Sequence, residues 1–198
     1  TSPPSQYTLP MIADVLDSPE ARQAVYPMSV EFYHEAGKLG LIGEEVELLE
    51  GVIFKKMPKS PLHQYLARKL QRLLAALVPS GYFVDRESPI TCVSSEPEPD
   101  VAVFIGSSDD YQSAHPTTAE LVIEISISTQ QRDRSKAAIY AEAGVKEYWI
   151  IEPDFSLVTL HTNPQATGYA TRQIFTAQDL VPSTIFPAFT LRLADLTA

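Results

Sequence analysis

The 198-residue sequence contains a single cysteine, Cys92, and no apolar run long enough to span a bilayer. One cysteine excludes an internal disulfide, which is typical of a protein from a reducing compartment. Residues 1–6 are polar and rich in proline, and they lack the basic start and apolar stretch of a secretory signal. We therefore expect a soluble, cytoplasmic protein with no membrane partner, and we interpret Cys92 as a small core residue.

Positive charge is scarce, because 15 Lys and Arg residues stand against 25 Asp and Glu residues, for a net charge of -10. This balance is unfavourable for a protein that coats nucleic acid through bulk charge. It still permits a local basic patch, or acidic residues that gather a metal ion. The sequence also lacks a glycine-rich phosphate loop, a zinc-type Cys/His spacing and a Ser-His-Asp arrangement, so no nucleotide cofactor is indicated.

The length of the chain is that of one domain with a sizeable core. Residues 1–26 contain several prolines and one short amphipathic piece, near residues 9–16. We expect residues 1–26 to form an N-terminal arm and residues 27–198 to form a single domain.

The apolar patterning predicts an α+β (or α/β) domain with one mixed β-sheet flanked by helices. Leucines at helical spacing predict the clearest helix, and runs of β-branched and aromatic residues predict the strands. Short segments between proline and glycine turns predict extra antiparallel strands at the C-terminus. The expected helices cover 29–38, 62–78 and 134–143; the expected strands cover 82–85, 89–93, 101–105, 121–127 and 147–151, with a hairpin in 46–57 and the C-terminal strands in 157–193.

Glu124 lies in the middle of an apolar run, residues 121–127. A carboxylate inside a sheet costs folding free energy unless it is paired, protonated or bound to a cation. Alternation along a strand puts Val122, Glu124 and Ser126 on one face. That face is either exposed, in which case Glu124 is simply hydrated, or buried around a functional carboxylate.

Asp100 opens a second apolar strand, directly after Pro99. An aspartate in this position is most often a turn or cap residue. If this strand pairs with the strand that carries Glu124, however, the two carboxylates meet at one end of the sheet. Such a pair forms an oxygen-rich site that suits Mg²⁺ or Mn²⁺.

Lys136 is expected on a helix face with Ile139, Tyr140 and Ala143, which we expect to point inward. A lysine on an inward face is unusual and needs a partner. It either reaches past the helix start to water or directs its ammonium group at the Glu124 site. In the second case it could polarise a water molecule or stabilise a phosphate oxygen.

Several short segments follow one another in a characteristic order. They are Glu-Pro-Asp at 98–100, Glu-Ile-Ser at 124–126, Asp-Arg-Ser-Lys at 133–136 and Tyr-Ala-Glu-Ala-Gly-Val-Lys-Glu-Tyr-Trp at 140–149, with Glu-Leu-Leu-Glu-Gly at 47–51 and Phe-Pro at 186–187. Together they resemble the restriction-endonuclease-like family known as domain of unknown function 820, within the PD-(D/E)XK nuclease superfamily. The resemblance extends over residues 28–196.

This resemblance implies a core of helix, three antiparallel strands, helix and strand, with a metal ion held by Asp100 and Glu124. The superfamily usually has a lysine two residues after the glutamate, where this chain has Ser126. The resemblance implies that Lys136, on the following helix, takes over that role. It also implies that Glu47 faces the site and completes the metal environment, although by itself Glu47 reads as an exposed strand residue.

Two further features sit on the helix expected at 62–78. His63 is either a satisfied core histidine or, as the resemblance implies, a supporting residue near the site. Arg68, Lys69 and Arg72 form a basic stripe on the opposite side of this helix. The stripe is either a solvated face or a set of nucleic-acid contacts to the phosphate backbone.

We interpret the chain as a Mg²⁺-dependent (or Mn²⁺-dependent) endonuclease that hydrolyses phosphodiester bonds in DNA, with Asp100, Glu124 and Lys136 as catalytic residues. Cutting both strands is simplest with two sites related by a two-fold axis, so we expect a homodimer. The alternative is a catalytically silent binding or regulatory module that kept the nuclease fold. In that alternative, Glu124 and Lys136 would form a buried salt bridge. The sequence does not discriminate DNA from RNA.

Overall fold

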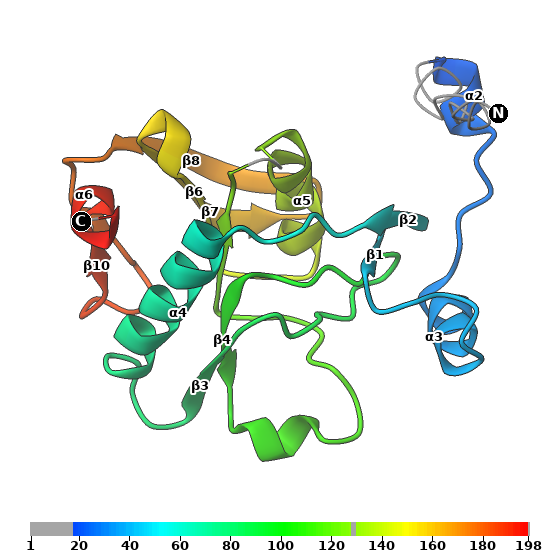
Figure 1. Ribbon diagram of the computed structural model, residues 1–198, viewed down its shortest axis with the longest axis horizontal. Coiled ribbons are helices and arrows are strands. Elements are labelled where there is room, and N and C mark those ends of the chain that lie inside the picture. Colours follow the sequence, from blue (N-terminus) through cyan, green and yellow to red (C-terminus); the bar gives the residue numbers. More distant parts are fainter. Residues whose placement is uncertain (1–17, 128–129, 198) are drawn as a thin grey trace, which may run out of the picture.

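The computed structural model describes residues 18–127 and 130–197, and its centre is a mixed six-stranded β-sheet (Figure 1). Strands β5 and β6 run parallel, and the other neighbouring strands of this sheet are antiparallel. The expected mixed sheet flanked by helices is therefore confirmed. Across the sheet the strands are β3 (Tyr82–Asp85), β4 (Val101–Ile105), β5 (Leu121–Ile125), β6 (Glu147–Glu152), β7 (Leu157–Gln165) and β8 (Gly168–Thr176).

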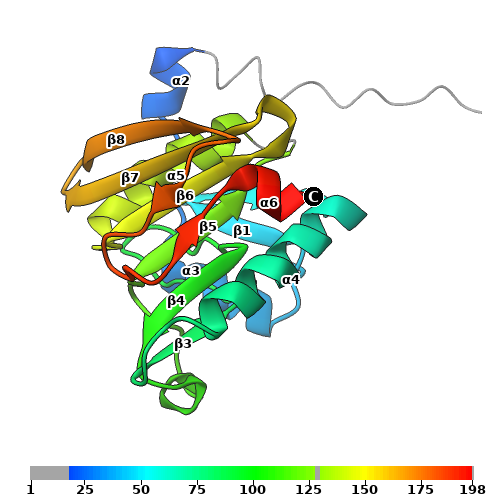
Figure 2. The ribbon, with the colours of Figure 1, turned by 90° about the vertical axis from the view of Figure 1, so that its left-hand side faces the viewer.

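Apolar side chains alternate along these strands and form a separate core on each face of the sheet. One core, which includes Ile123 and Ile125, packs against α4 (Pro61–Ala75) and α6 (Leu193–Thr197). These two helices lie on the same side of the sheet in Figure 2. The other core packs against α5 (Gln130–Glu142). Because Glu124 alternates with Ile123 and Ile125, its side chain lies on the α5 face.

A buried carboxylate on β6 ties the C-terminal segment to the sheet. Glu147 is fully buried and accepts hydrogen bonds from Ser183 Oγ at 2.8 Å, from the Thr184 backbone N–H at 2.5 Å and from Trp149 Nε1 at 3.2 Å. Trp149 in turn packs against Phe189, with 5.4 Å between the ring centroids. These contacts hold the short ribbon of β9 (Val181–Pro182) and β10 (Thr190–Leu191) against the core.

The described part of the chain N-terminal to α4 lies beside the six-stranded sheet and does not add strands to it. It contains the helix α3 (Val30–Lys38), which Ser29 caps by accepting a hydrogen bond from the Phe32 N–H. The hairpin β1 (Val46–Leu49) and β2 (Val52–Lys55) follows, and Glu50 and Gly51 at its turn both have positive φ. The remaining elements are α2 (Pro19–Gln23), which lies apart from the sheet in Figure 1, and the 3₁₀ turns η1 (Ser108–Tyr111) and η2 (Pro153–Phe155).

The strand predicted at residues 89–93 is wrong, because this segment is irregular. It folds back on the segment that follows, where the Ile90 N–H donates to the Pro97 carbonyl and the Glu87 N–H donates to the Pro99 carbonyl. Both acceptor residues are prolines, which have no N–H to return the hydrogen bond. A regular two-way ladder therefore cannot form.

Other boundaries differ from the expectation in smaller ways. The strand expected at 121–127 ends at Ile125, and the helix expected at 134–143 already begins at Gln130. The C-terminal strands, expected to be short, include the nine-residue strands β7 and β8, which extend the main sheet. The amphipathic piece near residues 9–16 lies outside the described residues. None of the helices in the described part of the chain has the length and apolar character needed to span a bilayer.

Replacing Gly51 by alanine should destabilise the protein by about 2–3 kcal/mol, because two penalties add. Its φ of 75° disfavours a side chain by about 1 kcal/mol, and a Cβ atom would lie 2.5 Å from Pro27 Cβ. Gly40→Ala is the matched control, since Gly40 has a φ of 68° but open space around it. Urea denaturation should show a larger loss of unfolding free energy for Gly51→Ala than for Gly40→Ala. Equal losses in the two variants would contradict the clash with Pro27.

Candidate active site

The pairing of β4 with β5 brings two acidic residues together at one end of the sheet. The register pairs Val101 with Ile123, so the next position places Asp100 opposite Glu124. Both side chains are buried, with 5% of Asp100 and 3% of Glu124 exposed. The interpretation of Glu124 as a hydrated surface residue is therefore wrong, and the two carboxylates predicted to meet do so.

Asp100 is held by donors from three different elements. Its Oδ2 accepts a hydrogen bond from the Ile125 N–H at 2.8 Å and lies 2.9 Å from His63 Nε2 at the start of α4. Its Oδ1 lies 3.2 Å from Lys59 Nζ. Burial opposes ionisation of Asp100, but His63, Lys59 and the Ile125 N–H together lower its pKa below the usual range. Because Asp100 is an ionised acceptor, Nε2 of His63 is the donor in this contact.

Lys136 joins two carboxylates that come from different strands. Its Nζ lies 3.0 Å from Glu124 Oε1 and 3.0 Å from Glu47 Oε2, and only 4% of the residue is exposed. The inward-facing helix stripe expected around Lys136 is confirmed, since Ile139 and Tyr140 are also buried. The alternative in which Lys136 reaches water is wrong, and so is the reading of Glu47 as an exposed strand residue.

The cluster carries more negative charge than its internal cations balance. Burial raises the pKa of Glu124 to about 8, and Asp100, Asp133 and Glu47 add to the rise, whereas Lys136 opposes it. Burial alone would lower the pKa of Lys136, yet Glu124 and Glu47 keep it above its usual value. One ammonium group is thus shared between two buried carboxylates, and a proton or another cation is favoured at Glu124.

The structure brings three further residues to the site: Arg132 and Lys59, which the sequence analysis did not name, and Tyr140, which it placed only on the inward helix face. Arg132 Nη1 lies 3.4 Å from Glu47 Oε1, and the Tyr140 hydroxyl donates to Glu124 Oε1 at 2.9 Å. Arg132 and Tyr140 are four residues before and after Lys136, so helical spacing alone could have found them. Lys59 lies in an irregular loop, where no periodicity marks it.

Ser126 and the basic stripe of Arg68, Lys69 and Arg72 are less directly connected to the paired carboxylates. Ser126 is fully buried, its N–H donates to the Ile151 carbonyl, and its hydroxyl has no hydrogen-bond partner among the described residues. Lys69 Nζ donates to the carbonyls of Asp195 and Leu196, at 2.8 and 3.1 Å, and so anchors α6. Arg68 and Arg72 remain exposed.

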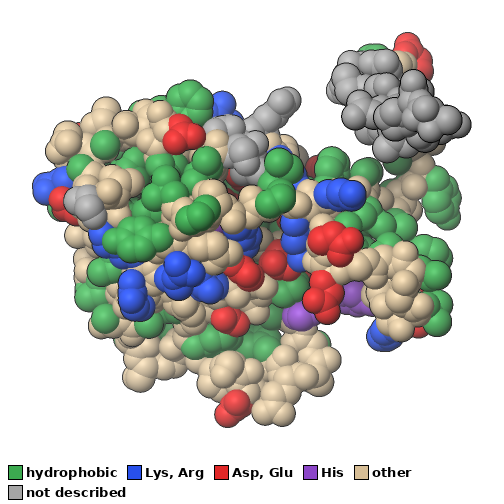
Figure 3. Space-filling model, viewed as in Figure 1, with side chains coloured by type: hydrophobic (Ala, Val, Ile, Leu, Met, Phe, Trp, Pro, Cys, Tyr) green, Lys and Arg blue, Asp and Glu red, His purple; other side chains and the backbone are tan. Residues whose placement is uncertain are grey.

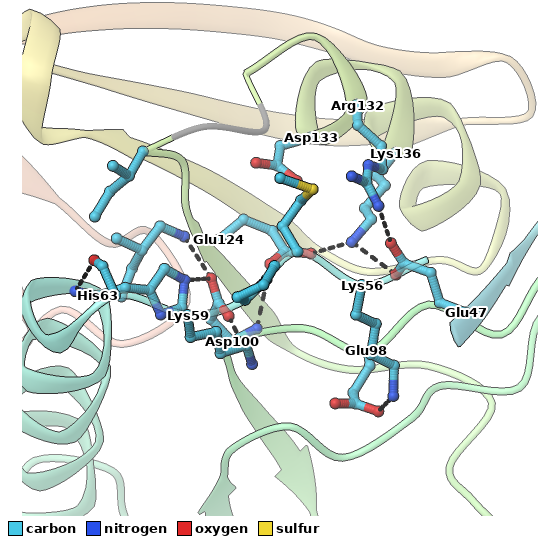
Figure 4. A pocket seen from close by; sticks show the side chains of 15 residues that line it. Glu47, Lys56, Lys59, His63, Glu98, Asp100, Glu124, Arg132, Asp133 and Lys136 are labelled. Carbon is cyan, nitrogen blue, oxygen red and sulfur yellow. Dashed lines mark hydrogen bonds and ion pairs between the residues drawn. The ribbon is translucent and has the colours of Figure 1, made fainter. Parts of the chain in front are cut away.

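These groups surround an open pocket between the loop before α4, the start of α4, the ends of β4 and β5, and α5 (Figure 4). In this view Lys59 lies on one side of Asp100 and Glu124, and Lys136 lies on the other side. The rim also carries Lys56, which is paired with Glu98 and donates to the Glu44 carbonyl at 2.8 Å. The pocket therefore has an acidic floor between cationic walls.

The donor set fits a hard divalent cation. Within the described residues no group of three His, Cys, Asp or Glu side chains is arranged as a complete metal cage. Mg²⁺, however, is commonly held by one or two carboxylates, with water and substrate phosphates as the other ligands. Asp100 and Glu124 supply two such carboxylates, and their excess of negative charge would be relieved by a bound cation.

Comparisons with known proteins identify a family and a similar fold. A family model described as "Uma2: Putative restriction endonuclease" matches residues 41–194, which is most of the chain. A solved structure described as a "putative nuclease belonging to DUF820", from Anabaena variabilis ATCC 29413, is similar with a TM-score of 0.71 and 21% sequence identity. The similarity covers 86% of this chain and 98% of that one, and at this identity it shows the fold. No match was found among curated proteins.

Removing the shared ammonium group should destabilise the protein in a pH-dependent way. Lys136→Met leaves Glu47 and Glu124 buried without their cation, which should cost about 3–5 kcal/mol at pH 8. The folded variant would retain a proton on Glu124 that the unfolded chain releases above about pH 4.5, so its stability should fall as pH rises from 5 to 8. Denaturant titrations at both pH values measure this.

The control for this experiment is Lys146→Met, which removes the partner of buried Glu120 at the surface. Because Lys146 is half-exposed, its loss should cost about 1 kcal/mol or less. If both variants lost the same amount of unfolding free energy, independently of pH, the shared buried ammonium group of Lys136 would be contradicted.

Proposed function

The chain belongs to the Uma2 family, and on that premise we propose that the protein is a metal-dependent endonuclease that hydrolyses phosphodiester bonds in DNA. The observation that carries this proposal is the buried, opposed pair of Asp100 and Glu124 with Lys136 3.0 Å from Glu124. A pocket open to solvent gives a substrate access to this group.

In the proposed enzyme, Asp100 and Glu124 hold Mg²⁺ or Mn²⁺. The bound ion would supply Lewis acidity, which neutralises phosphate charge and makes water a stronger nucleophile at neutral pH. His63 and the Ile125 N–H fix the orientation of the Asp100 carboxylate. Glu47 positions Lys136, whose ammonium group stabilises the developing charge on the phosphate oxygens or orients the attacking water.

The basic side chains around the pocket support a nucleic-acid substrate despite the net charge of -10. In Figure 3, blue side chains gather over α4 on the same face as the acidic group. Arg68 and Arg72 on α4 are exposed, and we propose that they contact the phosphate backbone on one side of the pocket. Lys69 would contribute mainly through α6, which it anchors.

The assembly and location of the protein are also proposals. Two copies related by a two-fold axis would place one site on each strand of a duplex, so we propose a homodimer. We propose residues 27–198 as the single catalytic domain, preceded by an N-terminal arm. We also propose a cytoplasmic location, where the single cysteine, Cys92, stays reduced; burial raises the pKa of its thiol to about 12 and so lowers its reactivity.

A catalytically silent binding module is the second candidate, and a specific observation favours it. Lys136 and Glu124 form the buried salt bridge expected of such a module, and Asp100 is already paired with the ammonium group of Lys59. The charges are therefore partly balanced without a metal ion. Measurements of metal binding and of cleavage distinguish a silent binding module from an enzyme.

The enzyme reading predicts metal-dependent cutting of DNA that Glu124→Gln, Asp100→Asn and Lys136→Met each reduce by about a hundredfold or more. Plasmid, linear duplex, single-stranded DNA and RNA are incubated with Mg²⁺, Mn²⁺ or EDTA, and products are resolved on gels. Glu120→Gln is the matched control, because Glu120 is a buried, lysine-paired glutamate away from the pocket. An absence of cutting, together with an absence of Mn²⁺ binding, would establish the silent module.

Mn²⁺ affinity should rise with pH between 6 and 8, by up to about tenfold per unit, because the ion must displace the proton that the raised pKa favours on Glu124. Calorimetry on the wild type, without DNA, measures this slope. In Glu124→Gln the slope should be lost. A wild-type affinity that is constant over this range would show that Glu124 is not the proton-linked ligand.

A further inference from the structure

Lys59 occupies a place in the pocket that the proposed function does not explain. It lies in the loop between β2 and α4, and its Nζ bridges buried Asp100 Oδ1 at 3.2 Å and the half-exposed Glu87 Oε1 at 3.1 Å. Its side chain is 23% exposed, so it reaches from solvent into the pocket. Lys59 thus connects the rim of the pocket with its acidic floor.

The hydrogen bonds of the two carboxylates show which oxygens are available to a cation. Asp100 Oδ2 already lies against the Ile125 N–H and His63 Nε2. Glu124 Oε1 already lies against Lys136 Nζ and the Tyr140 hydroxyl. Glu124 Oε2 is left with a long contact of 3.3 Å to the Asp100 N–H, and Asp100 Oδ1 is left with Lys59.

Lys59 therefore sits on the Asp100 oxygen that a divalent cation would need. We propose that Lys59 neutralises Asp100 in the free protein and becomes a phosphate-binding residue when a divalent cation takes its place on Oδ1. This inference rests on the proposed function, since it requires both the cation and a phosphate-containing substrate. It adds a second ammonium group to the site, on the side opposite Lys136 (Figure 4).

The surroundings of Lys59 favour an anion at the mouth of the pocket. Lys59 directly precedes Ser60, the N-cap of the 15-residue helix α4, and the first turn of this helix contains no acidic residue. Within α4 itself no carboxylate offsets the positive end of the helix dipole; the nearby carboxylates are Asp100, beside His63, and Glu87, beside Lys59. Lys59 and the start of α4 together make a positive edge beside the acidic floor, which suits a phosphate group.

Glu87 gives Lys59 a second partner at the rim. Glu87 has a φ of 57°, which is unfavourable for a residue with a side chain, and its N–H donates to the carbonyl of Pro99, next to Asp100. This backbone contact fixes Glu87 close to the site. The ammonium group can leave Asp100 without losing its other ion pair, so the rearrangement does not leave Lys59 unpaired.

Lys56 on the same loop provides a matched control. It has the same side chain and lies three residues earlier, but it is paired with Glu98 and with the Glu44 carbonyl instead of Asp100. A general effect of removing positive charge from the pocket rim would appear in both lysines. An effect on the cation at Asp100 would appear in Lys59 alone.

The experiment compares wild type, Lys59→Met and Lys56→Met as full-length proteins, with thermal melts to verify folding. Mn²⁺ binding is measured by calorimetry without DNA, and KM and kcat for DNA cleavage are measured at saturating Mn²⁺. Lys59→Met should bind Mn²⁺ about five- to tenfold more tightly, because the competing ammonium group is gone. It should also show a KM for DNA about tenfold higher, because a charged phosphate contact is lost. Lys56→Met should leave Mn²⁺ affinity unchanged.

This pair of opposite effects distinguishes the inference from a merely structural role, which would weaken metal binding or leave it unchanged. The inference about Lys59 would be overturned if Lys59→Met bound Mn²⁺ no more tightly than the wild type. It would also be overturned if binding were tighter but the KM for DNA were unchanged. In either case, a wild type that cuts DNA would leave the proposed function intact. A wild type that neither binds Mn²⁺ nor cuts would overturn both.

Discussion

The ammonium group of Lys136, shared between Glu47 and Glu124, is the contact on which the arrangement of the site depends. Three elements that are distant in sequence, β1, β5 and α5, each contribute one of these buried charges. A buried charge without its partner costs several kcal/mol, so none of the three elements can move away independently. The position of α5 on the sheet is thereby coupled to the position of the β1–β2 hairpin.

The aromatic run after α5 supports this arrangement without taking part in the chemistry. Glu147 binds the segment of Ser183 and Thr184, and Trp149 packs on Phe189. Tyr148 donates to the Asp133 carbonyl at 2.7 Å and packs against Tyr140 in a tilted arrangement, with 4.8 Å between the ring centroids. The Glu-Tyr-Trp motif is thus a structural signature: it fixes α5 and the C-terminal ribbon, and α5 in turn directs Lys136 at the carboxylates.

Sequence reasoning found the centre of the site because each central residue violates a local rule. Glu124 lies within an apolar strand, Asp100 directly precedes one, and Lys136 is a basic residue on an inward helix face. Pattern left each of them with an ordinary alternative, and the family resemblance favoured one shared site. Lys59 violates no rule, since a lysine in a loop is ordinary, and only the tertiary fold shows that it reaches Asp100. The strand predicted at 89–93 failed for a similar reason, because its hydrogen-bond partners are prolines that lie elsewhere in the sequence.

The wide separation of the site residues along the chain also has a consequence for biosynthesis. Glu47 and Lys136 come from distant segments of the chain, and the parallel pair of β5 and β6 between them requires the crossover helix α5, which carries Lys136. A ribosome-bound chain that has emerged only as far as β5 lacks Lys136 altogether. In the proposed endonuclease, the site is therefore incomplete on the nascent polypeptide until translation has passed α5.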